Sequence, residues 1–157
     1  MGTQSRMKTI VVGYDASDAA ERALDRAAEL AETLAARLVV VAVSAVPLPA
    51  PVLEPTGPML VPGGAAPPEA EQQPDPKELA QRRLEQARSR LASRSVDADY
   101  VAEVGSPAER LLAVADERDA ELILVGSGDH GLLERLIAQP VEEAVARRAG
   151  RDVLIVH

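Results

Sequence analysis

Short unbroken runs of aliphatic residues constrain this chain of 157 residues more than any other feature. A run that is apolar on both faces is typical of a strand buried in a parallel sheet, with helices covering either side. Four such runs are spread along the sequence. They are Ile10–Val12, Leu38–Val43, Leu122–Val125 and Val153–Val156. The sequence therefore predicts at least four buried parallel strands.

The intervals between these runs show two other hydrophobic patterns, one typical of an edge strand and one typical of helices. Over 98–104, small or apolar residues alternate with a mostly polar set, and one wet face predicts an edge strand. Apolar residues spaced three and four apart predict helices in the remaining intervals. The predicted helices run from the N-cap Ser17 to Leu34, over Lys77–Arg94, from Ser106-Pro107 onward, and over Pro140–Ala149.

Strands and helices alternate from end to end, which predicts an α/β fold: a five-stranded parallel doubly wound (Rossmann-like) sheet with four helices, in one domain over 1–157. The segment 47–76 does not fit this pattern, because it holds ten of the twelve prolines. We interpret it as a Pro-rich loop inserted after the second strand, at the end of the sheet where ligands bind. It is a candidate lid or binding arm for a protein partner.

Composition excludes several classes of partner. The net charge is −8, and Tyr14 and Tyr100 are the only aromatic residues, which argues against nucleic acid and membrane surfaces. The chain has no Cys and two His, so neither a disulfide framework nor a zinc site is expected. No run approaches 18 apolar residues and no signal peptide is recognisable, so we expect a cytoplasmic protein without a bound metal.

Two loops at carboxyl ends of predicted strands are the candidate ligand site, 13–17 and 126–131. Gly13 and Gly126 permit close approach of a backbone. Asp15 offers a carboxylate to ribose hydroxyls or, through water, to a metal; the alternative is a turn residue ahead of the N-cap. Residues 126–131 also match G-x-G-x-x-G, but Pro140 follows too soon for the long helix of a dinucleotide site. No Walker motif, nucleophile elbow or acid–base pair is present, so an enzyme is the least favoured class.

Four blocks in order along the chain resemble the universal stress protein family. They are Thr9–Ser17, Glu103–Glu109, Ala120–Ser127 and Asp152–Val156. The resemblance implies the strand order 3-2-1-4-5, a homodimer often formed through the last strand, and ATP at the crevice in one subclass. The strand expected at the dimer interface consists of Val153, Leu154, Ile155 and Val156.

The ATP-binding subclass carries G-x2-G-x9-G-[ST], and this motif is degenerate here. Starting from Gly126 the spacing is intact, but Asp129, Gln139 and Pro140 occupy the other three positions. Pro140 has no N–H to donate to a phosphate, and two glutamates follow it in the first turn of the predicted helix. Asp129 adds a third carboxylate, so we expect the ATP site to be dismantled.

These observations leave two functional hypotheses ahead of an enzyme. The first is a non-catalytic homodimeric stress-response or regulatory protein with no cofactor. The alternative is a protein that binds an adenine nucleotide (AMP, a cyclic nucleotide or, weakly, ATP) through Asp15, Val41 and Gly126. The candidate nucleotide-binding residues are Gly13, Asp15, Val41, Gly126, Ser127, Asp129, Gln139 and Pro140.

Overall fold

A computed structural model describes residues 9–46, 74–128 and 151–157 of the chain. Within these residues it contains five strands and three helices. The strands are β1 (Thr9–Gly13), β2 (Arg37–Ser44), β3 (Ala98–Val104), β4 (Leu122–Gly126) and β5 (Asp152–Val156). The helices are α1 (Asp18–Leu34), α2 (Pro76–Leu91) and α3 (Pro107–Glu117). The fourth helix, predicted over Pro140–Ala149, lies outside the described residues.

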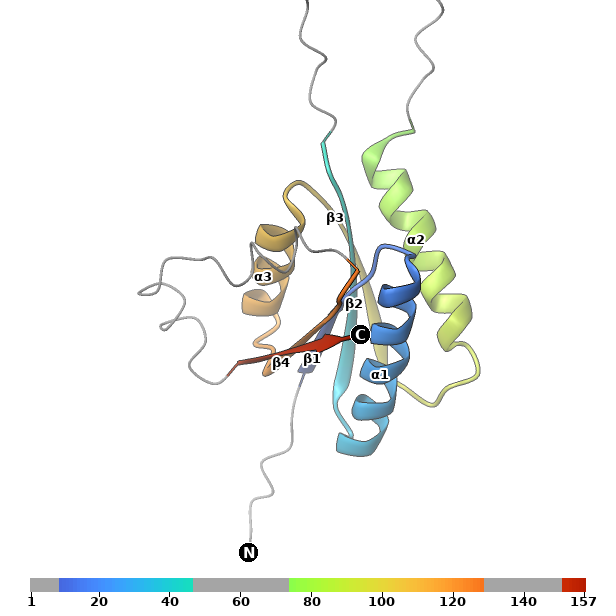
Figure 1. The fold of residues 1–157 in the computed structure, drawn as a ribbon, viewed down its shortest axis with the longest axis vertical. Coiled ribbons are helices and arrows are strands. Elements are labelled where there is room, and N and C mark those ends of the chain that lie inside the picture. Colours follow the sequence, from blue (N-terminus) through green and yellow to red (C-terminus); the bar gives the residue numbers. More distant parts are fainter. Residues whose placement is uncertain (1–8, 47–73, 129–150) are drawn as a thin grey trace, which may run out of the picture.

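All four strand pairings are parallel, and the strand order is β3-β2-β1-β4-β5. This confirms the predicted α/β fold class and the order 3-2-1-4-5. Figure 1 shows α1 and α2 on one face of the sheet and α3 on the other. The connections from β1 to β2 and from β2 to β3 thus cover one face, whereas the connection from β3 to β4 covers the opposite face. Because the chain leaves the neighbouring strands β1 and β4 on different sides, a crevice is expected at their carboxyl ends.

The core is aliphatic, as the absence of Phe and Trp requires. Alternate residues of the inner strands point to opposite faces and form two clusters. Ile10 and Val12 pack with the α1 and α2 face, while Val11 and Ile123 pack with the α3 face. All four side chains are fully buried. Burial on both faces explains why the sequence shows unbroken apolar runs rather than alternation.

Helix starts follow the sequence signals, with one correction. Ser17 caps α1, since its Oγ accepts from the N–H of Ala20 at 3.1 Å. At α2 the N-cap is Asp75, whose Oδ1 accepts from the N–H of Lys77 at 3.0 Å, and Pro76 is the first helical residue. The interpretation of 47–76 as a loop was therefore wrong for its last residue, Pro76, which is helical. An aspartate followed by proline is a helix start, because proline has no N–H to lose there. Residues 47–73 lie outside the described residues.

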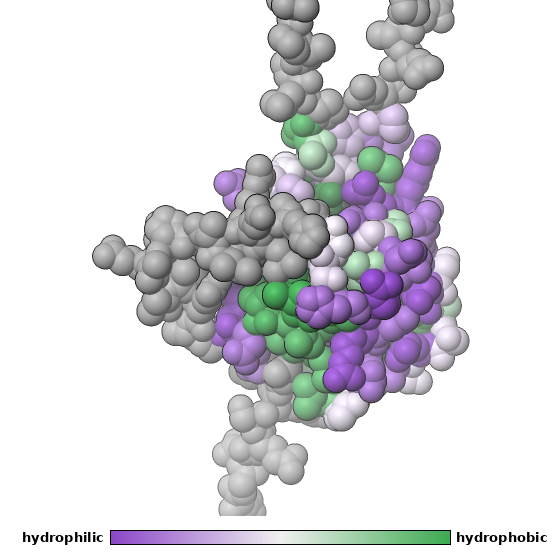
Figure 2. Space-filling model, viewed as in Figure 1, coloured by the Kyte–Doolittle hydropathy of each residue, from purple (hydrophilic) through white to green (hydrophobic). Residues whose placement is uncertain are grey.

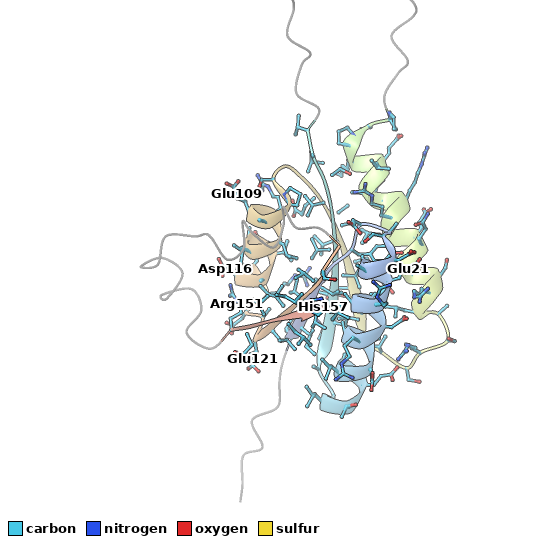
Figure 3. The ribbon with its side chains drawn as sticks, in the orientation of Figure 1. Glu21, Glu109, Asp116, Glu121, Arg151 and His157 are labelled. Atoms are coloured by element: carbon cyan, nitrogen blue, oxygen red, sulfur yellow. The ribbon has the colours of Figure 1, made fainter. Side chains whose placement is uncertain are left out.

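The two edges of the sheet differ in character. β3 is an edge strand, as predicted, and carries Asp99 in ion pairs with Arg37 and Arg118. At the opposite edge, β5 is aliphatic after Asp152. Figure 3 shows Arg151, just before β5, beside Asp116 of α3, and this ion pair fixes the start of the strand. No helix in the described part of the chain is long and apolar enough to cross a membrane.

Candidate functional site

A cavity of about 240 Å³ lies at the carboxyl ends of β1, β2 and β4. Its walls come from these strand ends, from the first turns of α1 and α3, and from one side chain of α2. This is the place where the connections from β1 and to β4 run to opposite faces of the sheet. Ligands of open α/β sheets bind at such a switch point. We refer to this cavity as the crevice.

Four of the eight predicted site residues meet in the crevice: Gly13, Asp15, Val41 and Gly126. They come from the ends of three neighbouring strands, and these ends lie at the same edge of the sheet because the strands are parallel. Ser127 is not a lining residue; its N–H donates to the carbonyl of Val156 at 2.9 Å and so extends the pairing of β4 with β5. The other predicted residues, Asp129, Gln139 and Pro140, lie outside the described residues.

Asp15 has a structural role that leaves part of its carboxylate accessible. Its Oδ1 accepts from the N–H of Ser17 at 2.9 Å, and between them Ala16 has a left-handed backbone with φ of 65°. Asp15 is therefore a turn residue ahead of the N-cap, which is the alternative role that the sequence predicts for it. Because Asp15 is exposed and lines the crevice, its carboxylate also has acceptor capacity for a ligand hydroxyl.

Gly126 is required by packing within the protein. A Cβ at this position would lie 2.6 Å from the carbonyl carbon of Ala19 and 2.7 Å from its oxygen. The close approach that the glycine predicts is thus an approach of α1 to β4. At Gly13 a Cβ would meet side-chain atoms of Leu111 at 3.4 and 3.8 Å and of Val125 at 3.9 Å, all ordinary contacts. The two glycines line the same crevice for different reasons.

Tyr14 is one of three polar lining residues that are absent from the eight predicted ones; the others are Ser17, the N-cap of α1, and Arg83. Its N–H donates to the carbonyl of Val41 at 2.8 Å, which joins the ends of β1 and β2. The residue is 4% exposed, and burial raises the pKa of its hydroxyl above the ordinary value of 10.0, with the Glu21 carboxylate adding to the rise. The phenol therefore remains neutral near pH 7.

Arg83 is the third of these polar lining residues. It belongs to α2, is partly buried, and its Nη1 donates to the carbonyl of Val43 at 3.2 Å. It directly precedes Leu84 in the apolar stripe of this helix, so it lies at the border of the buried face. This signal is not specific, because Arg90 directly precedes Leu91 of the same stripe and does not line the crevice.

The crevice combines apolar walls with a few polar groups. Val43, Ala45, Pro107 and Leu111 supply apolar surface. Across the described residues no group of three or more His, Cys, Asp and Glu side chains is placed to hold a metal ion. The described lining also contains neither His nor Cys. An apolar cavity with few polar groups is suited to recognising a small organic ligand.

Comparisons with known proteins agree with this fold. Residues 7–157 match the Universal stress protein family. The chain is 34% identical, over 98% of both chains, to universal stress protein Rv1636 of Mycobacterium tuberculosis. A crystal structure from the same family from Burkholderia pseudomallei is 30% identical with a TM-score of 0.63, covering 97% of each chain. A universal stress protein in complex with cAMP is 31% identical with a TM-score of 0.59, covering 98% of each chain.

The fold and crevice define an α/β protein with a cavity at the switch point of a parallel sheet. The family match spans nearly the whole chain. The chain therefore belongs to the universal stress protein family.

Proposed function

We propose that this protein is a non-catalytic regulatory protein that binds an adenine mononucleotide, such as cAMP or AMP, in the crevice. The observation that carries the proposal is the convergence of Gly13, Asp15, Val41 and Gly126 around one cavity at the switch point. The structure in complex with cAMP, from a relative that aligns over 98% of this chain, supports the ligand class.

The size and lining of the crevice favour a compact ligand. Its volume of about 240 Å³ is slightly below the roughly 300 to 1,000 Å³ of typical small-molecule sites. The side chains of Val41 and Leu111 offer apolar contact to a base, and Asp15 offers an acceptor to a sugar hydroxyl. A nucleoside with one phosphate can make these contacts to its base and sugar, and it needs no long site for a polyphosphate chain.

ATP is a poorer ligand on electrostatic grounds. Only Gly126 of the four phosphate-motif residues is retained, and Pro140 replaces a hydroxyl residue while removing an N–H donor. Asp129 and the two glutamates after Val141 bring three further negative charges to the same segment. A triphosphate meets much more repulsion there than a monophosphate.

We also propose that the protein is a cytoplasmic homodimer joined through β5. The strand lies at the edge of the sheet, where backbone groups are available to pair with a second strand. Figure 2 shows an apolar patch over β5, and Val153 is 37% exposed. Sedimentation should show a dimer at micromolar concentration that Val153→Lys dissociates; a wild-type monomer would contradict this interface.

Calorimetry with cAMP, AMP and magnesium ATP tests the ligand assignment. We expect cAMP or AMP to bind with Kd below about 100 μM, and ATP more weakly than about 1 mM, a free energy near −4 kcal/mol. Asp15→Asn retains an oxygen for the Ser17 N–H but lacks the charge, so nucleotide affinity should fall about tenfold. ATP binding as tight as that of cAMP would refute the proposal, as would unchanged affinity in the variant.

A further inference from the structure

We infer that Arg83 of α2 binds the phosphate of the mononucleotide, in place of the degenerate motif after β4. This inference rests on the proposed function and adds the group that recognises the anion. Arg83 is the only cationic residue among the described residues that line the crevice. Three observations support phosphate binding by Arg83: its charge environment, its geometry and the separate negative charge of Asp15 in the same cavity.

Partial burial without an ion pair sets Arg83 apart from the other arginines of its helix, which are exposed. Arg90 and Arg94 of this region pair with carboxylates of α1, and Arg88 lies over the ring of Tyr100 at 4.6 Å. Arg83 forms no ion pair with any described residue, and its hydrogen-bond partner is a neutral carbonyl. The positions three and four residues away on α2 hold no acid either. They are Leu79, Ala80, Gln86 and Ala87.

A partly buried guanidinium without a counterion has a reason to bind an anion. Partial burial removes some of its hydration, which one carbonyl oxygen does not replace. An anion in the crevice supplies the missing charge, and the hydrogen bond is charge-assisted on both sides. The same reasoning does not apply to Arg82, which is exposed to water and does not line the crevice.

The geometry prepares Arg83 for this role. The bond from Nη1 to the carbonyl of Val43, at 3.2 Å, holds the guanidinium against the end of β2. Arginine has five N–H donors, so four remain after this bond. Two parallel donors of the planar fork match two oxygens of one phosphate. Because the carbonyl restrains the side chain before the ligand arrives, less conformational entropy is lost on binding.

The described lining also contains one negative side chain, Asp15, at the end of β1. Arg83 and Asp15 form no ion pair with each other, so the crevice presents separate cationic and anionic positions. This pattern complements a nucleoside monophosphate, with its phosphate at Arg83 and its sugar hydroxyls at Asp15. One guanidinium balances one phosphate charge and is insufficient for three.

The test compares AMP with adenosine, which lacks the phosphate, on the full-length protein. Wild type should bind AMP at least tenfold more tightly than adenosine. Arg83→Met should remove this difference by weakening AMP at least tenfold, with adenosine affinity unchanged within about twofold. Arg83→Lys keeps the charge but not the fork and should retain part of the preference. Arg82→Met, a matched loss of charge on the neighbouring residue, should behave as wild type.

Several outcomes would overturn the inference. Equal wild-type affinity for AMP and adenosine would leave nucleoside binding intact but show that no phosphate contact exists. A parallel loss of AMP and adenosine in a folded Arg83→Met protein would assign Arg83 to the cavity wall. If AMP, adenosine and cAMP all fail to bind to the wild type, the proposed function itself fails. Thermal unfolding of each variant separates these results from misfolding, and Arg83→Lys provides the test should Arg83→Met not fold.

Discussion

Helices α1 and α2 cover the same face of the sheet but are held there in different ways (Figure 1). α1 buries seven residues, six of them alanines, and its backbone reaches β4 at Gly126. α2 buries only Ala80, Leu84, Ala87 and Leu91, near the β3 edge. Its outer side is joined to α1 by ion pairs of Arg90 and Arg94. Figure 2 shows the hydrophilic surface over these two helices.

We therefore regard α1 as the fixed wall of the crevice and α2 as its adjustable wall. Small residues allow α1 to approach the sheet so closely that Ser17 and Ala20 have little freedom to move or change. α2 contributes a single polar side chain, Arg83, from a helix with fewer buried residues than α1. Substitutions on α2 are therefore expected to change ligand preference with less loss of stability than substitutions at the contact between α1 and β4.

The largest expected effect comes from breaking the close packing of α1. Gly126→Ala places a Cβ against the backbone of Ala19, which cannot rotate away as a flexible side chain does. We expect a loss of about 3 kcal/mol in the free energy of unfolding, measured with urea. Gly13→Ala is the matched control, since its Cβ meets Leu111 at an ordinary 3.4 Å and should cost under about 1 kcal/mol. Equal losses in both variants would contradict the fixed-wall account.

A smaller effect is expected from breaking the ion pairs between the two helices. Arg90 donates to both carboxylate oxygens of Asp25, at 2.9 and 2.8 Å, and to Glu21 at 3.3 Å. Figure 3 shows Glu21 on the side of α1 that faces α2. These side chains are partly exposed, so Asp25→Asn should cost under about 1 kcal/mol at pH 7. Glu29→Gln, which breaks an exposed pair with Arg26 within α1, should cost still less.

The pH dependence of this small effect has a definite sign. The hydrogen bond from Arg90 lowers the pKa of Asp25 below its ordinary value of 3.8. A carboxyl with a lower pKa in the folded protein stabilises the fold above its unfolded pKa, and this stabilisation disappears as the pH falls through the folded value. The stability difference between wild type and Asp25→Asn should thus shrink below about pH 4. A difference that grows in acid would show that another interaction is responsible.

Most of the fold was predictable because burial on both faces leaves a strong signal. The runs at Ile10 and Leu38 have no polar face, so they fit few places other than inner parallel strands. Gly13, Asp15, Val41 and Gly126 were also predictable as neighbours, since parallel strands bring their carboxyl ends to one edge.

Arg83 and the role of Gly126 were not predicted, for two physical reasons. Arg83 is one of five arginines in the predicted helix, and which of them reaches the crevice depends on the helix start at Asp75 and on its rotation against the sheet. The close contact of Gly126 with Ala19 depends on how near α1 lies to β4, which is a tertiary distance. A glycine that lets a ligand approach the backbone and a glycine that lets a helix approach it look the same in the sequence.

A crystal structure of the protein with cAMP would locate each part of the ligand in one experiment. We expect cAMP in the crevice, with its phosphate within about 3 Å of the Arg83 guanidinium. Its free ribose hydroxyl should lie within hydrogen-bonding distance of Asp15. A phosphate placed on the loop after Gly126, or cAMP bound away from the crevice, would refute the assignment of the phosphate to Arg83.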